Sequence, residues 1–140
     1  MTRSFVADAS VAVGWVHPAQ STVDTAATLT AIAEGAVLEV PALWPLEVAN
    51  ALTVLERRGK LTASERQIAL GWLRALRLRI DHEMAAVAFS RLAELARTYR
   101  LSVYDAAYLE LAHRRSLPLV CKDEPLRAAA RKCGVALYSA

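Results

Sequence analysis

The fold is decided by residues 4–16, which read Ser-Phe-Val-Ala-Asp-Ala-Ser-Val-Ala-Val-Gly-Trp-Val. The residues before Asp8 predict a short apolar strand, and those after Ser10 predict a helix. The helix is expected to end before His17-Pro18, because proline disfavours helix in the residue that precedes it. A carboxylate placed between a buried strand and a helix resists leaving water unless it caps, pairs or binds metal.

Strand and helix alternate along the rest of the chain. Further strands are predicted at residues 36–40, 78–80, 117–121 and 135–138, and helices at residues 22–33, 43–58, 62–76, 83–99, 104–115 and 125–132. Thr62-Ala-Ser-Glu65 has the spacing of a capping box that opens one of these helices. The alternation predicts a three-layer α/β/α domain, with a central parallel sheet of four to five strands and helices on both faces.

Composition sets the class of protein. The chain has 140 residues, of which 55% are hydrophobic, and this excludes disorder and favours a single domain over residues 1–140. No run approaches the roughly 18 to 20 apolar residues of a membrane span. The first apolar run contains a charge, which argues against a signal peptide, so we expect a cytoplasmic protein without membrane contact. The net charge of +3 is compatible with nucleic acid without being specific for it.

Four carboxylates are expected at one edge of the sheet. Asp8 and Asp123 follow predicted strands, whereas Glu47 and Asp105 lie in the first turns of helices. Each also has a structural interpretation, since Asp8 and Asp123 can cap helices, Asp105 can pair with Ser102 in a capping box, and Glu47 can complement a helix dipole. The capping interpretation explains each acid singly and leaves their common location unexplained.

Metal chemistry accounts for the common location. Two carboxylates about 4 Å apart repel by roughly 4 kcal/mol at an effective dielectric constant near 20, so four in one pocket need protons or a cation. Oxygen ligands without histidine or cysteine favour Mg²⁺, with Mn²⁺ possible. A water on such an ion can be the nucleophile in phosphodiester hydrolysis.

Other enzyme classes lack their motifs. The sequence has no G-x-S-x-G element, no G-x-G-x-x-G and no P-loop. A receiver domain is one alternative, in which Asp81 accepts a phosphoryl group while Asp8 binds Mg²⁺ and Lys122 ends a late strand. That alternative rests on analogy of fold and leaves Glu47 and Asp105 without a role.

Four blocks in order along the chain carry a family resemblance. They are Val6-Ala-Asp8-Ala-Ser10, Pro41-Ala-Leu-Trp-Pro-Leu-Glu47-Val-Ala-Asn50-Ala-Leu, Leu101-Ser-Val-Tyr-Asp105-Ala-Ala-Tyr108-Leu-Glu-Leu-Ala and Leu119-Val-Cys-Lys-Asp123-Glu-Pro-Leu-Arg-Ala-Ala-Ala130. Together they resemble the PIN-domain family and, within it, the VapC toxins of type II toxin–antitoxin pairs. The resemblance implies a PIN-like fold and a Mg²⁺-dependent endoribonuclease toxin.

The resemblance also implies roles and partners. Asp8 and Asp105 would be the firmest metal ligands, and Glu47 and Asp123 would complete the shell or orient waters. Three further residues would support the acids or hold a phosphate: Ser10, Asn50 and Cys121. The implied partners are an RNA substrate, a small antitoxin that fills a groove beside the acids, and a second copy in a homodimer.

The chain departs from the family pattern beside the fourth acid. Cys121 stands where the family often has Ser or Thr, and a thiol is a weaker hydrogen-bond donor than a hydroxyl. Lys122 is adjacent to Asp123 and would divert that acid from metal if the two side chains paired. These departures keep open a second alternative, a non-catalytic PIN-fold module that acts through protein contacts.

Overall fold

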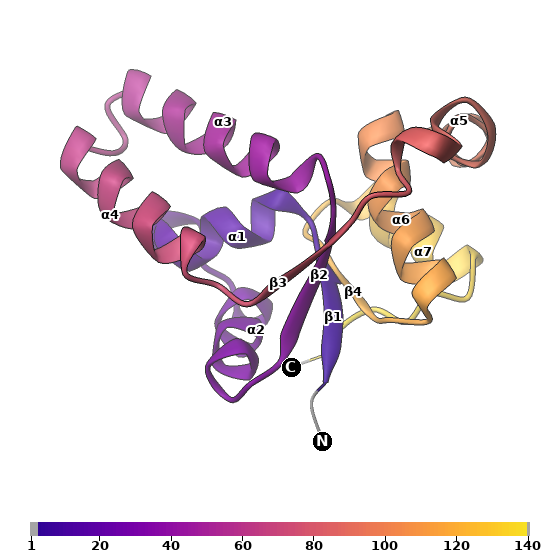
Figure 1. The fold of residues 1–140 in the computed structure, drawn as a ribbon, viewed down its shortest axis with the longest axis horizontal. Helices are drawn as coiled ribbons and strands as arrows, with labels where there is room; N and C mark the ends of the chain where they lie inside the picture. The colour runs from indigo at the N-terminus through magenta and orange to yellow at the C-terminus, as the bar shows by residue number, and fades with distance from the viewer. Residues whose placement is uncertain (1–2, 140) are drawn as a thin grey trace.

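A computed structural model describes residues 3–139 and contains one parallel sheet of four strands within that range. The order across the sheet is β3-β2-β1-β4, so the first strand of the chain lies in the interior of the sheet (Figure 1). The strands are β1 (Ser4–Ala7), β2 (Val37–Pro41), β3 (Leu78–Asp81) and β4 (Leu119–Val120).

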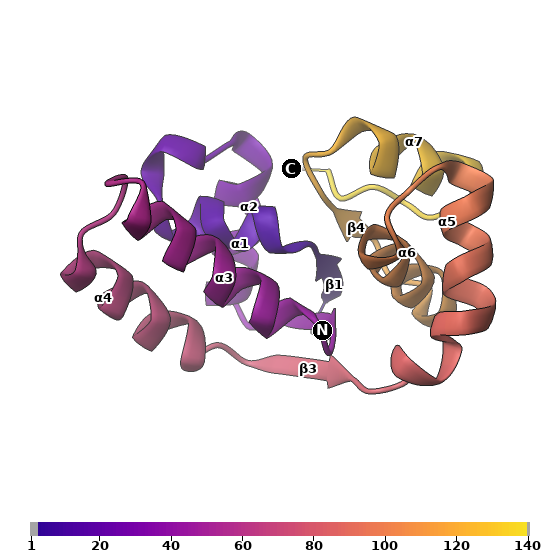
Figure 2. The ribbon, with the colours of Figure 1, turned by 90° about the horizontal axis from the view of Figure 1, so that it is seen from above.

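Helices cover both faces of the sheet. Figures 1 and 2 show α1 to α4 on one side and α5 to α7 on the other. The predicted three-layer α/β/α architecture is confirmed. Within the described residues, none of the helices is both long and apolar enough to cross a membrane. The helices are α1 (Ala9–Val16), α2 (Val23–Ala33), α3 (Trp44–Arg57), α4 (Ala63–Arg74), α5 (Ala93–Tyr99), α6 (Val103–Arg115) and α7 (Glu124–Lys132).

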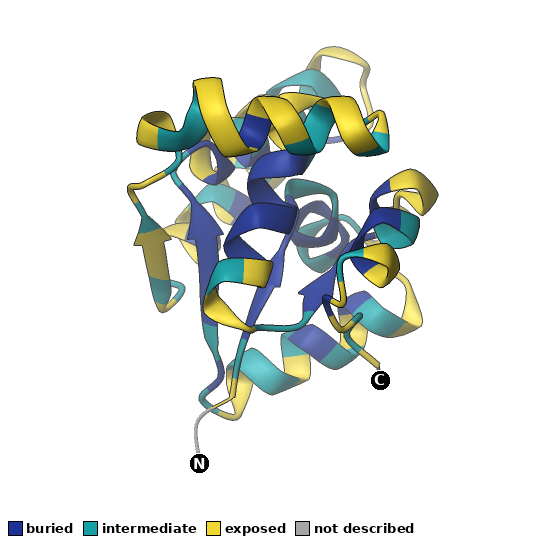
Figure 3. Ribbon diagram, turned by 90° about the vertical axis from the view of Figure 1, so that its right-hand side faces the viewer, coloured by how far each residue is buried: buried dark blue, intermediate teal, exposed yellow. Residues whose placement is uncertain are grey.

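The core forms around β1 and α6. Phe5, Val6 and Ala7 are at most 1% exposed, as expected for a parallel strand covered on both faces. Helix α6 is buried without interruption from Ala106 to Ala112, and it contacts β1, β2 and β4 (Figure 3). Helix α6 begins at the edge where the parallel strands end. Because the middle of this helix is fixed in the core, its first turn is held in place at that edge.

Local signals in the sequence match the observed element ends. In the predicted capping box, Glu65 N donates to Thr62 Oγ1 at 3.0 Å and Thr62 N donates to Glu65 Oε1 at 2.8 Å. Gly59 has a φ of +70° just after α3, in the left-handed region that glycine tolerates best. These local devices fix the α3–α4 hairpin that extends from the sheet.

The prediction of one regular helix over residues 83–99 is wrong. The segment contains a 3₁₀ turn, η2 (Ala85–Val87), a π-helical turn, η3 (Ala88–Leu92), and then α5. Ser90 Oγ donates to the Val87 carbonyl at 3.4 Å, a local side-chain bond that competes with the α-helical pattern. Arg91 is held by Glu110 of α6 at 3.4 Å, so tertiary ion pairs also fix this irregular segment.

The last predicted strands are shorter than expected. Strand β4 covers two residues, and the segment at residues 135–138 contributes one isolated bridge, Leu119 to Leu137. Pro118 has no N–H to donate, although its carbonyl accepts from Val6 N at 2.9 Å. Within the described residues the sheet therefore has four strands, the lower end of the predicted range.

Candidate functional site

The four predicted acids lie near one edge of the sheet, at the starts of four helices. Asp8 directly follows β1 and is the N-cap of α1, and Asp123 is the N-cap of α7 after β4. Glu47 lies in the first turn of α3, and Asp105 lies in the first turn of α6. Helix N-termini carry partial positive charge, which favours carboxylates at these positions.

Asp8 is the most buried of the four. The residue is 7% exposed, and its Oδ1 accepts from Ser10 Oγ at 2.8 Å and from Val11 N at 3.3 Å. Burial raises the pKa of Asp8 to about 6, the hydrogen bonds from Ser10 and Val11 oppose that rise, and the charges of Asp105 and Glu47 add to it. Asp8 therefore both caps its helix and lies in the field of the other acids.

The other acids influence one another in the same way. Burial raises the pKa of Asp105, and the charge of Asp123 raises it further. Burial also raises the pKa of Glu47, with a further rise from the charge of Asp105. Each of the four acids thus affects, or is affected by, another of the set. The common edge predicted from the sequence is an electrostatic neighbourhood in the folded chain.

Tyr108 belongs to the site and was missed by the sequence analysis. Its hydroxyl donates to Glu47 Oε1 at 2.5 Å, and the tyrosine itself is 1% exposed. Two signals pointed to it, because Tyr108 follows Asp105 by three residues on a helix and a buried tyrosine needs a partner for its hydroxyl. The identity of that partner depends on packing between α6 and α3.

Lys122 precedes Asp123 in the sequence and would divert that acid from metal if the two side chains paired. Lys122 Nζ donates to the Gln20 carbonyl at 2.6 Å, and within residues 3–139 it forms no ion pair with Asp123. Asp123 is exposed, and its Oδ2 accepts from Leu126 N at 3.2 Å. Lys122 therefore does not prevent the Asp123 carboxylate from binding a cation at this edge.

Three supporting residues were predicted around the acids. Ser10 contacts Asp8, as described above. Cys121 is buried, and burial raises the pKa of its thiol to about 12, so the thiol remains protonated at neutral pH. Asn50 is exposed one turn after Glu47, and no hydrogen bond joins them in the described part of the chain.

The donor chemistry of this edge fits a divalent cation. Carboxylate oxygens are the ligands that Mg²⁺ and Mn²⁺ prefer, and the pKa values of Asp8, Glu47 and Asp105 are raised first by burial and then by neighbouring carboxylates, both of which a bound cation would offset. The side chains are not gathered around one point, since among residues 3–139 no three His, Cys, Asp or Glu side chains lie close enough to hold an ion together. Mg²⁺ keeps several waters, so one or two carboxylates with waters are a sufficient set.

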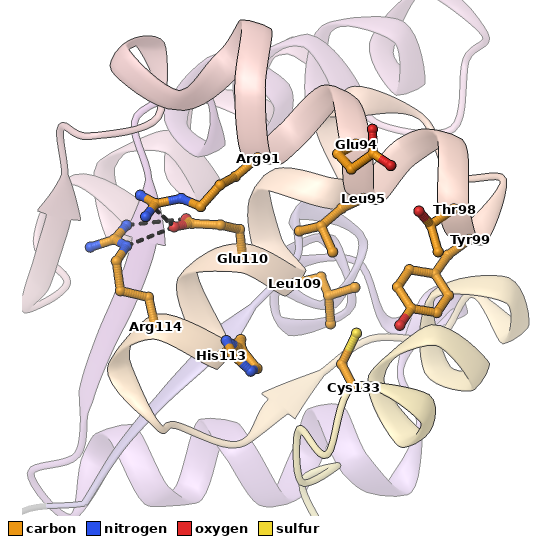
Figure 4. A pocket seen from close by; sticks show the side chains of 10 residues that line it. All are labelled: Arg91, Glu94, Leu95, Thr98, Tyr99, Leu109, Glu110, His113, Arg114 and Cys133. Atoms are coloured by element: carbon orange, nitrogen blue, oxygen red, sulfur yellow. Dashed lines mark hydrogen bonds and ion pairs between the residues drawn. The ribbon is translucent and has the colours of Figure 1, made fainter.

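A cavity lies away from these acids. It has a volume of about 570 Å³ and is bordered by α5, the C-terminal half of α6, and Cys133 (Figure 4). At one end Arg114 binds Glu110 at 2.8 Å, and Arg91 binds the same carboxylate at 3.4 Å. Arg114 is also paired with Asp81 and Arg91 with Glu83, so the charged groups at this end of the cavity are engaged in ion pairs.

Asp81 does not have the surroundings of a phosphoacceptor. It ends β3, at the outside of the sheet, and its two carboxylate oxygens accept from Arg114 at 2.7 and 3.1 Å. A paired carboxylate is a poor nucleophile. One strand, β2, separates β3 from β1 and Asp8, and two strands separate β3 from β4. The receiver-domain alternative therefore has no support at this residue.

Comparisons with known proteins agree with the observed fold. The family model described as PIN domain matches residues 5–132. Among curated protein sequences, none matches the chain significantly.

Three solved structures have a similar fold. PAE2754 from Pyrobaculum aerophilum has a TM-score of 0.68 at 22% identity, over 92% of this chain and 86% of that one. VapBC2 from Rickettsia felis, bound to a DNA fragment from their promoter, has a TM-score of 0.66 at 12% identity, over 96% and 97%. FitAcB from Neisseria gonorrhoeae has a TM-score of 0.65 at 18% identity, over 96% of each chain.

Proposed function

This chain belongs to the PIN-domain family, and on that premise we propose that it is a divalent-cation-dependent endoribonuclease that acts as the toxin of a type II toxin–antitoxin pair. One observation carries the proposal. Four carboxylates from the starts of α1, α3, α6 and α7 share one edge of the sheet, and the pKa values of Asp8, Glu47 and Asp105 are raised by burial and by the charge of other acids of the set. Helix capping alone does not require that these carboxylates lie close enough to affect one another's charge.

The acids have different tasks in this proposal. Asp8 and Asp105 would be the principal ligands of Mg²⁺ or Mn²⁺, and Glu47 and Asp123 would complete the shell or orient waters. Ser10 fixes Asp8 through its hydroxyl. When bound, the cation would neutralise the acids and lower the pKa of a water that attacks the RNA phosphodiester. Because Asp8 titrates near pH 6, it is mostly ionised and ready to bind a cation at neutral pH.

An antitoxin partner is part of the same proposal. The fold likeness to VapBC2 and the sequence resemblance to VapC toxins support it. The resemblance implied a groove beside the acids, but the groove proposed here for the partner lies between α1, α2 and α4 and is lined by none of the four acids. It has a volume of about 360 Å³, and apolar groups line it, among them Trp15, Ile68 and Trp72. Ile68 is 70% exposed, so an apolar partner segment would gain by covering it. A homodimer is also proposed, on the resemblance alone.

Cleavage by purified protein tests the enzymatic proposal. The protein is incubated with an RNA pool and Mg²⁺, next to the Asp8→Asn and Asp105→Asn variants. Both variants are expected to lose cleavage, whereas Glu94→Gln, an exposed acid on α5 paired with Arg97, is expected to cleave as the parent does. Equal cleavage by the parent and both Asn variants would refute the metal mechanism.

Growth of the host cell tests the toxin role. Expression of the chain alone is expected to stop growth, and co-expression of the adjacent small reading frame is expected to restore it. The Asp8→Asn variant is expected to be harmless. Toxicity that persists in this variant would show that catalysis at the acidic edge is not the cause.

A non-catalytic PIN module is the second candidate function. The buried thiol of Cys121 favours it, since a hydroxyl that the family often provides is missing. Mn²⁺ binding without cleavage of any RNA in the pool would support this candidate over the nuclease.

A further inference from the structure

The contact between Tyr108 and Glu47 joins two of the helices that carry the acids. The hydrogen bond spans 61 residues of sequence and connects α6 to the first turn of α3. Tyr108 is 1% exposed, whereas Glu47 is only partly buried. The rigid partner is therefore the tyrosine, and the partner that it can orient is the carboxylate.

The bond fixes a side chain that otherwise has considerable freedom. A glutamate has three rotatable side-chain bonds, and holding it in one rotamer has an entropic cost. Within the described residues, Tyr108 supplies the hydrogen bond that Glu47 accepts. It engages Oε1 and leaves Oε2 free of protein hydrogen bonds there, so one oxygen is restrained while the other can reach a ligand.

The hydroxyl is suited to donate to a carboxylate. A phenol has an ordinary pKa of about 10 and is protonated at neutral pH, whereas an ionised carboxylate only accepts, so the hydroxyl of Tyr108 is the donor in this hydrogen bond. Its position three residues after Asp105 means that α6 supplies one acid directly and orients another acid on α3.

We propose that Tyr108 is a positioning residue of the acidic edge, whose hydroxyl holds the Glu47 carboxylate in the orientation needed for divalent-cation binding. This inference rests on the proposed function, because it requires that the edge binds a cation. Partners that orient a metal ligand typically contribute about 10- to 100-fold in metal affinity. A tyrosine that only filled the core would contribute through its ring and not through its oxygen.

Mn²⁺ affinity, measured by calorimetry on the RNA-free protein, separates these roles. Tyr108→Phe keeps the ring and removes the hydroxyl, and it is expected to weaken Mn²⁺ binding about 10- to 100-fold. The matched control is Tyr104→Phe, on the same helix, where the side chain is 64% exposed and the affinity is expected to stay unchanged. Replacing Tyr108 by 4-aminophenylalanine, which keeps a donor at the same ring position, is expected to restore much of the affinity.

A double-mutant cycle with Glu47→Ala shows whether the effect passes through that carboxylate. In the Glu47→Ala background, Tyr108→Phe is expected to cause no further loss of Mn²⁺ affinity. An equal loss in both backgrounds would overturn the positioning role, as would unchanged affinity in Tyr108→Phe alone. If Tyr108→Phe does not fold, the protein with 4-aminophenylalanine at position 108 provides the test. Wild-type Mn²⁺ affinity in that protein would support the role of the donor group. Failure of that protein to fold, as in Tyr108→Phe, would refute it.

The outcomes also separate this inference from the proposed function. A parent protein that binds no Mn²⁺ would overturn both. A parent that binds Mn²⁺ and cleaves RNA, together with a Tyr108→Phe variant of equal affinity, would overturn the role of Tyr108 alone.

Discussion

Asp8→Asn is expected to stabilise the cation-free protein while it abolishes cleavage. Burial in the native fold moves the pKa of Asp8 from its ordinary value of 3.8 to about 6. Since one pKa unit corresponds to about 1.4 kcal/mol, the ionised carboxylate costs the native state about 3 kcal/mol at neutral pH. The amide of the variant carries no charge, and its oxygen can still accept from Ser10 and Val11.

The sign of the pH dependence follows from proton binding. Between pH 4 and pH 6 the native protein binds more protons at Asp8 than the unfolded chain does. The free energy of unfolding of the parent therefore falls as the pH rises through this window, and the full cost applies above it. The advantage of Asp8→Asn is expected to reach about 1 to 3 kcal/mol at pH 7.5 and to vanish near pH 4.

Urea unfolding, followed by tryptophan fluorescence in the presence of a chelator, measures this difference. Asp81→Asn is a control of opposite sign, because the charge of Asp81 is paired with Arg114 and its removal is expected to destabilise the fold. Added Mg²⁺ is expected to stabilise the parent and to leave Asp8→Asn unchanged, since ligands stabilise the state that binds them. An Asp8→Asn protein that is less stable than the parent at pH 7.5 would refute the reasoning.

Three further predictions concern other parts of the molecule. Ile68→Asp, in the groove between α1, α2 and α4, is expected to prevent neutralisation by the antitoxin in co-expression while RNA cleavage by the purified variant is retained. Arg114→Ala is expected to lower the free energy of unfolding by about 1 to 3 kcal/mol, because it leaves Asp81 without its cation while Glu110 keeps Arg91, and a loss under about 0.5 kcal/mol in urea unfolding would contradict this. Cys121, whose thiol has a pKa of about 12, is expected to resist iodoacetamide at pH 8 in the native protein and to react after unfolding, as mass spectrometry would show.

The sequence predicted those features that depend on local patterns. The strand before Asp8 and the capping box at Thr62 depend on neighbouring residues, and both are present as predicted. The irregular turns within residues 83–99 were not predictable, because apolar periodicity does not distinguish an α-helix from 3₁₀ and π turns held by ion pairs to α6.

The location of the four acids was also predictable, because it depends on the order of the strands and helices. The order of strands and helices was sufficient to bring the four acids to one edge. The hydrogen bond between Glu47 and Tyr108 depends on the approach of the first turns of α3 and α6 at the edge where the strands end. Such an approach is a property of tertiary packing, and no spacing in the sequence encodes it directly.

The acids are divided between the two helical layers of the fold. Asp8 and Glu47 belong to α1 and α3 on one side of the sheet, whereas Asp105 and Asp123 belong to α6 and α7 on the other. A cation bound to both Asp8 and Asp105 would therefore cross-link the layers, as a disulfide cross-links two segments of chain. The loaded protein would therefore resist shear between the two layers more strongly than the cation-free protein. Slower amide hydrogen exchange in β1 and β4 on addition of Mn²⁺ would be the direct sign of this coupling.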